Sequence, residues 1–468
     1  MDRDQRETEG IVSNVTSIAK AKKRATYALT DTGNAERFAA QHRDKARYVA
    51  SWKTWIVWDG SRWRHDDRGM VDLLSKETAR SLDAEVQLSA DDDERKRIRA
   101  HATKTESRSG RENMLVLARA ELAASPDEFD TDPMLLNVAN GTIDLRTGEL
   151  HLHTREDMIT RVLDVPYDAT ATCTVFDSFV STAMADRADL VSYLQKAIGY
   201  SLTGDVREQV FFFLHGEGAN GKSTLAEIVM RMLGSYAKTA APDLLMMREQ
   251  EQHATWTAEL QGARFVVCQE IAEGKAWNER TLKQLTGGDS IVANRMHRDP
   301  VTFRPSHKLW VCANQKPKMR DGGLATWRRV RLIPFSVTVP AERRDKALGS
   351  KLLGEMPGIL RWAVQGCLEW QAEGLEAPAE VLDATAAYRD ESNHVPTFAA
   401  DRLSFGQGQT VPKSALYEAY TLWCKHNRES ALPRPEIQRR VLAMPGVTEG
   451  RNKTDRFLSG VSLLSFLP

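Results

Sequence analysis

The chain has 468 residues, and at roughly 100–200 residues per domain this length predicts two to four domains. Hydrophobic residues make up 41% of the chain and charged residues 27%, which is typical of a soluble globular protein. The formal net charge is zero, which excludes a global positive field. A nucleic-acid site would therefore have to be a local basic patch.

The cysteines and the apolar runs restrict the compartment. The five cysteines lie far apart and form no CxxC pair, which favours a reduced compartment and excludes the spacing of a zinc site. The start, MDRDQRETEG, has no apolar core and is not a signal peptide, and no apolar run approaches the roughly 18 residues of a membrane helix. We therefore expect a soluble, cytoplasmic protein with no membrane partner.

Residues 1–175 predict two segments. Residues 1–45 are polar and rich in charge, which indicates a frayed tail followed by a helix. Residues 46–175 predict a mixed α+β and helical domain. Its expected parts are two short aromatic strands around the Asp59-Gly60 turn, a helical stretch at 70–125, and a hairpin at 135–153 with turns at Asn140-Gly141 and Thr147-Gly148.

From about residue 176 the pattern changes to that of an α/β domain. The run QVFFFLHG (209–216) is the best candidate for a central buried strand, and strands and helices alternate from there to about residue 336. With a helical stretch at 341–376, this predicts a domain with a parallel sheet over residues 176–376. Residues 377–468 are more polar and predict helices followed by a short strand pair.

The strongest signal is a phosphate-binding loop. GEGANGKST matches G-x-x-x-x-G-K-[ST], follows the apolar strand and precedes a helix-like segment. Glycines let the backbone N–H groups surround the phosphates at the positive end of a helix, while the lysine reaches the β and γ phosphates and the serine hydroxyl can bind Mg²⁺. The predicted ATP-binding residues are Gly216, Glu217, Gly218, Ala219, Asn220, Gly221, Lys222, Ser223 and Thr224.

Two further strands end in polar residues. ARFVVCQE (263–270) ends in Glu270, which at the carboxyl edge of a parallel sheet would lie beside the phosphate loop and could orient Mg²⁺ or polarise the attacking water. Glu273 follows within a turn as a second candidate. SHKLWVCAN (306–314) ends in Asn314, a position that bonds the γ-phosphate or the water in ring-forming ATPases. We predict Ser223 and Glu270 as the magnesium ligands.

Arg328 and Arg329 precede the next strand in TWRRVRLIPF (326–335). An arginine presented to the nucleotide of a neighbouring subunit can stabilise the charge of the transition state. A basic strand start held by surface salt bridges explains the same pattern, and the sequence does not decide between the two for either arginine alone.

A region rich in cationic residues is a candidate DNA-binding site. Residues 295–331 hold ten cationic residues against Asp299 and Asp321, which is the local patch that phosphate contacts require. DSIVANRMHRDPVTFRP (289–305) predicts two strands around a tip near 297–300, and such a hairpin could insert into a ring and grip the DNA backbone. The cationic residues are Arg295, Arg298, Arg304, Lys308, Lys316, Lys318, Arg320, Arg328, Arg329 and Arg331.

The order of these motifs resembles superfamily 3 helicases, and within them the phage and plasmid primase–helicase family that includes the poxvirus primase–helicase. The resemblance covers about residues 45–375. It rests on GEGANGKST, ARFVVCQEIAEG, LKQLTGGDSIVANRMHRDPVTFRP, KLWVCANQKP and WRRVRLIPF, preceded by NGTIDLRTGELHLHTREDMIT and YLQKAIGYSLTGD.

The resemblance implies an AAA+-like P-loop core that assembles into a homo-hexamer, hydrolyses ATP between subunits and moves single-stranded or forked DNA past a pore hairpin. By motif, Glu270 takes the catalytic acidic position, Asn314 the sensor position, and Arg328 or Arg329 the finger. The DNA-facing motif holds Lys283, Arg295, His297 and Arg298. The tail is similar to the winged-helix module of many relatives, a module that binds either duplex DNA or protein.

The chain departs from the family in two ways. Relatives often have two adjacent acidic residues at the end of the second strand, where this chain has Gln269-Glu270. Many also carry a priming domain, and only about 45 residues precede the helicase part here. The resemblance therefore predicts a helicase part without the priming domain, which works with a separate primase or polymerase.

The leading hypothesis is an ATP-dependent DNA helicase in phage, prophage or plasmid replication, in the cytoplasm of a bacterial host. One alternative is an origin-remodelling or helicase-loading ATPase without processive unwinding. Another is a nucleotide-binding assembly or scaffold protein, against which the intact set of Lys222, Ser223, Glu270 and the arginine pair argues.

Overall fold

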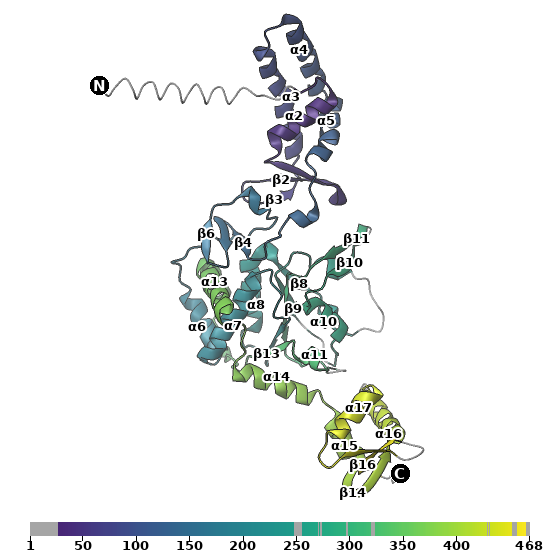
Figure 1. Cartoon of the computed structure of the whole chain (residues 1–468). Coiled ribbons are helices and arrows are strands. Elements are labelled where there is room, and N and C mark those ends of the chain that lie inside the picture. Colours follow the sequence, from purple (N-terminus) through teal and green to yellow (C-terminus); the bar gives the residue numbers. More distant parts are fainter. Residues whose placement is uncertain are drawn as a thin grey trace, which may run out of the picture. The chain divides into compact units, whose positions relative to one another are not determined.

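The computed structural model describes residues 27–247, 255–269, 271, 274–295, 298–319, 323–427, 429, 431–451 and 456–464 (Figure 1). The chain divides into two compact units. The first contains residues up to Thr131 together with His153–Arg161, and the second contains Asp132–Leu152 and everything from Val162 onward. This division groups residues 132–152 with the second unit, whereas the sequence groups them with the preceding segment, and the four-part division remains a prediction.

The first unit combines a small antiparallel sheet, with strand order β1-β2-β3, with long helices. The Asp59-Gly60 turn joins β2 to β3 and residues 70–125 are helical, as predicted, while β1 is a strand that the sequence did not separate from β2. Phe38 and Met114 are fully buried where α2 packs on α5. The elements are α2 (Asp31–His42), β1 (Ala46–Val49), β2 (Thr54–Trp58), β3 (Trp63–His65), α3 (Met70–Leu88), α4 (Asp92–Glu106) and α5 (Arg108–Glu121).

The second unit opens with an antiparallel sheet of β4 (Leu135–Val138), β5 (Gly141–Asp144) and β6 (Glu149–His151). Both predicted turns are confirmed, and Gly148 occupies the left-handed region at φ +77°. Helices α6 (Thr174–Ala183) and α7 (Ala188–Leu202) follow and lead to the central sheet.

The central sheet is parallel throughout and has five strands in the order β13-β7-β12-β9-β8. Because β7 is the first of these strands along the chain and lies between the later strands β13 and β12, the chain must cross to both sides of β7. The strands are β7 (Phe211–His215), β8 (Ala237–Ala240), β9 (Phe265–Gln269), β12 (Lys308–Ala313) and β13 (Val330–Pro334). The predicted α/β core with a parallel sheet is confirmed, in an arrangement consistent with a P-loop-like core.

Both faces of this sheet are covered, which explains the unbroken apolar runs in its strands. Phe212 and Trp310 face one core, to which α6, α7, α8 (Lys222–Leu233) and α13 (Met356–Glu373) contribute. Phe211 and Phe213 face a second core that contains Trp277, beside α10 (Glu279–Thr286), together with side chains of α11 (Leu324–Trp327) and α14 (Ala379–Glu391). The sheet is therefore a rigid, two-sided support for the loops at its edges.

Two short insertions lie between the strands. Helix α9 (Thr255–Ala258) precedes β9, and a hairpin of β10 (Ile291–Arg295) and β11 (Arg298–Phe303) lies between α10 and β12. The predicted hairpin is confirmed as an antiparallel pair with a register shift between Ala293 and Arg295. After the sheet, α12 (Leu348–Gly354) leads into α13.

The C-terminal segment has its own hydrophobic core, which includes Phe398, Tyr420 and Ile437. Its strands form a three-stranded antiparallel sheet in the order β14-β16-β15. Along the chain the elements are α15 (Val395–Arg402), β14 (Leu403–Pro412), α16 (Lys413–His426), α17 (Arg434–Leu442), β15 (Thr448–Arg451) and β16 (Arg456–Leu463).

Candidate nucleotide-binding site

The glycine loop predicted from the sequence connects the carboxyl end of β7 to the first residue of α8. Ala219 and Gly221 have positive φ angles of 57° and 90°, so the loop reverses sharply before the helix starts. Gly216 lies so close to the end of β13 that a Cβ atom there would be 2.1 Å from the carbonyl oxygen of Phe335. The backbone therefore encloses a small space at the positive end of α8.

Lys222 is only 4% exposed, and its ammonium lies inside this loop. Nζ donates to the carbonyl oxygen of Gly216 at 2.6 Å and to Oδ1 of Asn220 at 2.9 Å. Burial lowers the pKa of Lys222. The partners are neutral oxygens of the loop itself, so the buried charge has no anionic partner among them.

Asn220 fixes the loop to the sheet. Its side chain is 4% exposed, and Nδ2 donates to the carbonyl oxygens of Phe335 at 3.1 Å and Glu217 at 3.2 Å. The backbone N–H of Phe335 donates in turn to the carbonyl of His215 at 2.7 Å. The sequence predicts Asn220 only as a member of the motif, because its partner Phe335 lies 115 positions away.

Ser223 and Thr224 occupy the first turn of α8, where Ser223 is exposed and Thr224 is partly buried. The Ser223 hydroxyl is thus free of the core that holds the rest of the helix. Its position next to Lys222 is the one that the sequence predicts for a magnesium ligand.

The strand order brings the predicted sensor position beside the loop. β12 lies between β7 and β9, and Cys312 pairs with Leu214 on one side and with Gln269 on the other. Asn314, the residue after β12, is exposed at this edge. Glu270 and Glu273 lie outside the described residues, so the acidic position remains a prediction.

His215 lies beside the loop but was not among the residues predicted from the sequence. It ends β7 directly before the loop, and burial lowers the pKa of its imidazole, with further lowering by the ammonium groups of Lys316 and Lys222. A hydrogen bond to the backbone of Asn314 opposes this shift. His215 is therefore a neutral group between the loop lysine and Asn314, and its place at the end of the apolar run is the signal that could have identified it.

Arg328 and Arg329 lie at the opposite edge of the sheet. They precede β13, where Val330 pairs with Phe211, whereas Pro334 pairs with His215 beside the loop. Four strand residues separate these edges by about 13 Å. Arg328 is exposed and donates from Nη2 to Oε1 of Gln209 at 3.0 Å, and Arg329 is partly buried and donates to the carbonyl of Ala325. The fold does not bring this arginine pair to the loop of its own chain.

The predicted DNA-facing residues lie on α10 and the hairpin. The side chain of Lys283 is 39% exposed, and its Nζ lies 3.9 Å from Oε2 of Glu279. Arg295 and Arg298 are paired in register between β10 and β11 at the end of the hairpin. His297 lies outside the described residues.

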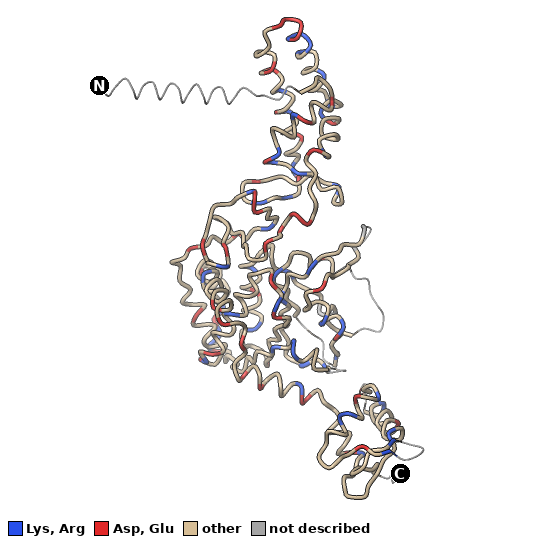
Figure 2. The backbone as a smooth tube through the Cα atoms, viewed as in Figure 1, with Lys and Arg blue, Asp and Glu red and all other residues tan. Residues whose placement is uncertain are grey.

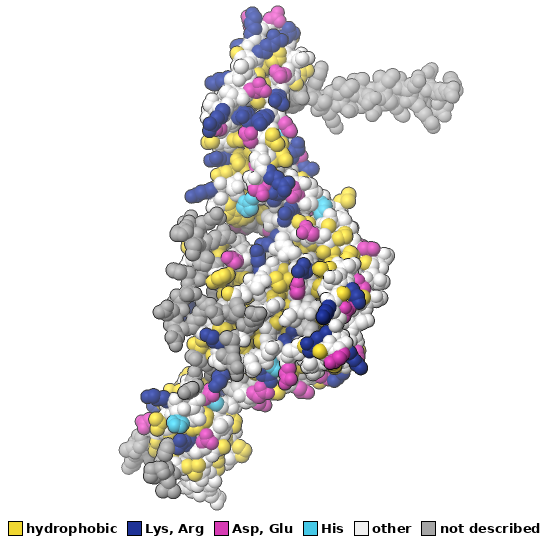
Figure 3. All heavy atoms as spheres, turned by 180° about the vertical axis from the view of Figure 1, so that it is seen from behind, with side chains coloured by type: hydrophobic (Ala, Val, Ile, Leu, Met, Phe, Trp, Pro, Cys, Tyr) yellow, Lys and Arg dark blue, Asp and Glu magenta, His cyan; other side chains and the backbone are white. Residues whose placement is uncertain are grey.

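The prediction that the cationic residues of 295–331 form a basic surface is wrong for Lys308. This side chain is 2% exposed and donates to the carbonyl oxygens of Thr203, Asp205 and Ser306, and burial lowers its pKa. Lys316 is paired with Glu391 at 2.7 Å. In Figure 2 the positions of Lys and Arg alternate with those of Asp and Glu along the backbone, and the face drawn in Figure 3 shows side chains of both signs.

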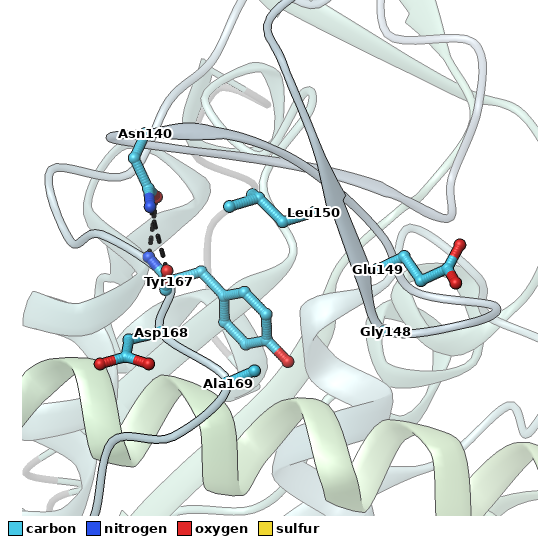
Figure 4. A pocket seen from close by; sticks show the side chains of 7 residues that line it. All are labelled: Asn140, Gly148, Glu149, Leu150, Tyr167, Asp168 and Ala169. Carbon is cyan, nitrogen blue, oxygen red and sulfur yellow. Dashed lines mark hydrogen bonds between the residues drawn. The ribbon is translucent and has the colours of Figure 1, made fainter.

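A cavity of about 770 Å³ lies elsewhere in the second unit (Figure 4). Both ends of the Asn140 amide are used there, since Nδ2 donates to the carbonyl of Tyr167 at 3.0 Å and Oδ1 accepts from its N–H at 2.9 Å. Two acidic side chains disfavour a phosphate ligand. Residues 216–224 are all described and do not line this cavity, which is bounded by Asn140, Gly148, Glu149, Leu150, Tyr167, Asp168 and Ala169.

Comparison with known proteins places the chain in a family. A family profile described as "D5 N terminal like" matches residues 35–185, and one described as "Family of unknown function (DUF5906)" matches residues 214–329, which includes the loop. The chain belongs to the D5-like primase–helicase family. The predicted family relationship is thereby confirmed.

Members of this family among viral proteins are similar over much of the chain. "Putative helicase L207/L206" of Acanthamoeba polyphaga mimivirus is 24% identical over 353 residues, which are 69% of this chain and 36% of that protein. "Putative helicase 184R" of Invertebrate iridescent virus 6 is 24% identical over 339 residues, 64% of this chain and 35% of that protein. "Putative primase C962R" of African swine fever virus is 24% identical over 215 residues, 43% and 22% of the two chains. The chain thus spans about a third of the length of the first two relatives.

The fold is similar to that of a solved structure. The apo structure of the NrS-1 C-terminal region has a TM-score of 0.51 and 8% identity, and the match covers 92% of this chain and 99% of that one. At this identity the likeness concerns the fold alone. Within the described ranges, no helix combines the length and the apolar character needed to span a bilayer, and no group of three or more His, Cys, Asp or Glu side chains there could hold a metal ion.

Proposed function

We propose that this chain is an ATP-driven DNA helicase of superfamily 3, with an AAA+-like core, that acts in the replication of viral, phage or plasmid DNA. One observation carries the proposal: a buried lysine in a glycine loop, Lys222, at the carboxyl edge of a five-stranded parallel sheet. Ligands of such sheets bind outside the carboxyl ends of the strands, where the strand order reverses. The helicase and primase names of its relatives support the same function.

The loop residues fit the triphosphate of ATP. The Lys222 ammonium has only neutral oxygens as its hydrogen-bond partners, and anionic phosphate oxygens are stronger acceptors that would replace Gly216 and Asn220. Ser223 would hold Mg²⁺ together with Glu270, and the bound ion would neutralise charge on the phosphates. Asn314 would position the attacking water, and the neutral imidazole of His215 forms a hydrogen bond with the Asn314 backbone.

The arginine pair is proposed to act on a neighbouring subunit. Because Arg328 and Arg329 lie about 13 Å from the loop edge along β13, either can reach a triphosphate only if that nucleotide belongs to another chain. In a ring, every subunit can place its arginine at the nucleotide of the next subunit. Head-to-tail contacts between identical subunits form such a ring when the successive rotations add up to a full turn. We propose a homo-hexamer, in which the finger stabilises charge in the transition state.

DNA is proposed to pass along α10 and the β10–β11 hairpin. Lys283, Arg295 and Arg298 would contact the phosphate backbone of single-stranded or forked DNA, and His297 would contribute at the tip. Both elements lie between strands β9 and β12 in the chain, and these strands end beside the nucleotide loop. A change at the nucleotide would therefore reach α10 and the hairpin from the carboxyl end of β9, which the chain leaves before α10 begins.

The C-terminal domain, 377–468, is proposed to be winged-helix-like. Its order of helix, strand, two helices and two strands, with β16 between β14 and β15, supports this assignment. It would bind duplex DNA or another protein. The division into 1–45, 46–175, 176–376 and 377–468, a separate primase or polymerase as partner, and action in the cytoplasm of a bacterial host belong to the same proposal.

The test is unwinding of forked DNA by the full chain with ATP and Mg²⁺, beside sizing of the assembly. Lys222→Ala should abolish hydrolysis and unwinding, whereas Lys96→Ala, which changes an exposed lysine paired with Asp93, should retain both. Undiminished hydrolysis by Lys222→Ala would remove the loop assignment. Hydrolysis stimulated by DNA without unwinding would favour an origin-remodelling or helicase-loading ATPase, and nucleotide binding without hydrolysis would favour a scaffold.

A further inference from the structure

Helix α10 starts with a buried carboxylate. Glu279 is 7% exposed, and its Oε2 accepts a hydrogen bond from the hydroxyl of Thr326 at 2.7 Å. Thr326 is fully buried on α11. Removing a carboxylate from water is costly, and a glutamine at this position would accept the same hydrogen bond without that cost. Glu279 therefore carries its carboxylate into the protein at the point where α10 meets α11.

The same oxygen faces a cation on the other side. Lys283 lies one helical turn after Glu279, and its Nζ is 3.9 Å from Oε2, at the limit of an ion pair. The lysine side chain is 39% exposed, so it reaches solvent, whereas the hydroxyl partner does not. One carboxylate oxygen thus connects a solvent-facing ammonium with a buried hydroxyl.

These partners lie on the two elements that the helicase function uses. α10 carries Lys283 and leads into the β10–β11 hairpin, while Thr326 precedes Arg328 by two residues. Residues 324–327 form a single helical turn that ends at the arginine pair, and the backbone N–H of Arg328 donates to the carbonyl of Leu324. The hydroxyl that Glu279 holds therefore belongs to the turn that sets the direction of these arginines.

We infer that Glu279 is a positioning residue that couples DNA contact at Lys283 to the placement of Arg328 and Arg329. The inference rests on the proposed helicase function. A DNA phosphate near Lys283 draws the ammonium away from Oε2, and the carboxylate then interacts more strongly with the Thr326 hydroxyl, its buried hydrogen-bond donor. This holds the arginine turn in one arrangement, so that DNA on one subunit prepares the finger for its neighbour's nucleotide. Such coupling is reciprocal between the two sites.

A purely structural role predicts something different. An acidic residue in the first turn of a helix interacts favourably with the helix dipole, and a hydrogen bond to Thr326 joins α10 to α11. Loss of these contacts would lower stability and would change hydrolysis equally with and without DNA. The ratio of the hydrolysis rate with DNA to the rate without DNA therefore distinguishes the coupling role of Glu279 from a purely structural role.

The experiment measures ATP hydrolysis by the full chain with and without forked DNA, and DNA affinity at matched salt. Glu279→Gln retains the size and the hydrogen-bond acceptor and removes the charge, and we expect the ratio of DNA-stimulated to basal rate to fall by about fivefold or more. Glu355→Gln is the matched control, because Glu355 accepts from the backbone N–H groups of Val175 at 3.1 Å and Phe176 at 2.9 Å, away from α10 and α11, and its ratio should equal that of the wild type.

Thr326→Val, which is nearly isosteric, is the second variant and should lower the ratio as well. The double variant should be no worse than the more impaired single variant, because both changes interrupt one connection. A wild-type ratio in Glu279→Gln or in Thr326→Val would overturn the inference. A wild-type chain that hydrolyses ATP at the same rate with and without DNA would instead overturn the proposed function, and this inference with it.

Discussion

The close approach of Gly216 to the end of β13 leads to a sharp prediction. In Gly216→Ala the new methyl group would lie 2.1 Å from the carbonyl oxygen of Phe335 and 2.5 Å from Nδ2 of Asn220, whereas ordinary contacts begin near 3.4 Å. Phe335 is held by its own hydrogen bond to His215, so the loop must move by more than an ångström or β13 must shift. Gly218 is the matched control, because a Cβ there would meet no described atom within 4 Å.

The size of the effect follows from two terms. Overpacking of this kind costs about 1–3 kcal/mol, and loss of the bond between Asn220 and Phe335 costs about 1 kcal/mol more. If the loop must recover its native form to bind ATP, a total of about 2–4 kcal/mol weakens binding roughly 30-fold to several hundred-fold. Gly218→Ala should bind within about threefold of the wild type, since a change of that size is well below 1 kcal/mol.

The assay is titration of a fluorescent ATP analogue followed by anisotropy with Mg²⁺ present, supported by the shift in melting temperature that saturating ATP produces. Wild-type affinity in Gly216→Ala would refute the argument that the loop is held against Phe335. Equal losses of ATP affinity in Gly216→Ala and Gly218→Ala would also refute this argument. Affinity would then depend on the tip of the loop at Gly218 instead of on the contact of Gly216 with Phe335.

Three further results are expected. Arg298→Ala should weaken binding of single-stranded DNA and reduce its salt dependence while hydrolysis without DNA is retained; equal affinity at matched salt would reject the hairpin role. Chains lacking the finger, Arg328→Ala or Arg329→Ala, should regain hydrolysis when mixed with Lys222→Ala chains, because an intact loop then meets an intact arginine; a mixture that stays inactive would contradict action between subunits. Burial lowers the pKa of His307 to about 4, so the unfolded chain binds more protons than the folded chain between pH 6.5 and 4 and stability falls as the pH drops through this window. His307→Leu should remove up to about 3 kcal/mol of that loss, measured by urea unfolding at each pH.

Features that depend on neighbouring residues could be predicted from the sequence. The glycine loop, the apolar strand before it and the turns at Asn140-Gly141 and Thr147-Gly148 are each specified by a few adjacent side chains, and the structure places them as expected. The β10–β11 hairpin follows for the same reason, because alternating residues around a short tip specify it locally.

Features that depend on distant residues could not be predicted. The sequence predicts Lys308 as a surface cation. It does not show that the carbonyl groups that accept hydrogen bonds from Lys308 belong to residues about a hundred positions earlier, Thr203 and Asp205. The contact of Asn220 with Phe335 is hidden for the same reason. The edge strand β8 has the sequence AKTA, which is too short and too polar to predict a strand of a buried sheet.

The strand β13 connects the two ends of the proposed reaction. At its carboxyl end the Phe335 carbonyl accepts from Asn220, which also holds Lys222, and at its amino end stand Arg328 and Arg329. Because β13 is paired along its length with β7 and packed on both faces, it moves as a unit instead of bending between these ends. A triphosphate that draws Lys222 away from Asn220 therefore changes the forces at one end of a rigid strand whose other end serves the next subunit. In a ring this makes each nucleotide site sensitive to its neighbour's occupancy, so hydrolysis should depend on ATP concentration cooperatively, and Asn220→Ala should reduce the Hill coefficient more than it reduces affinity.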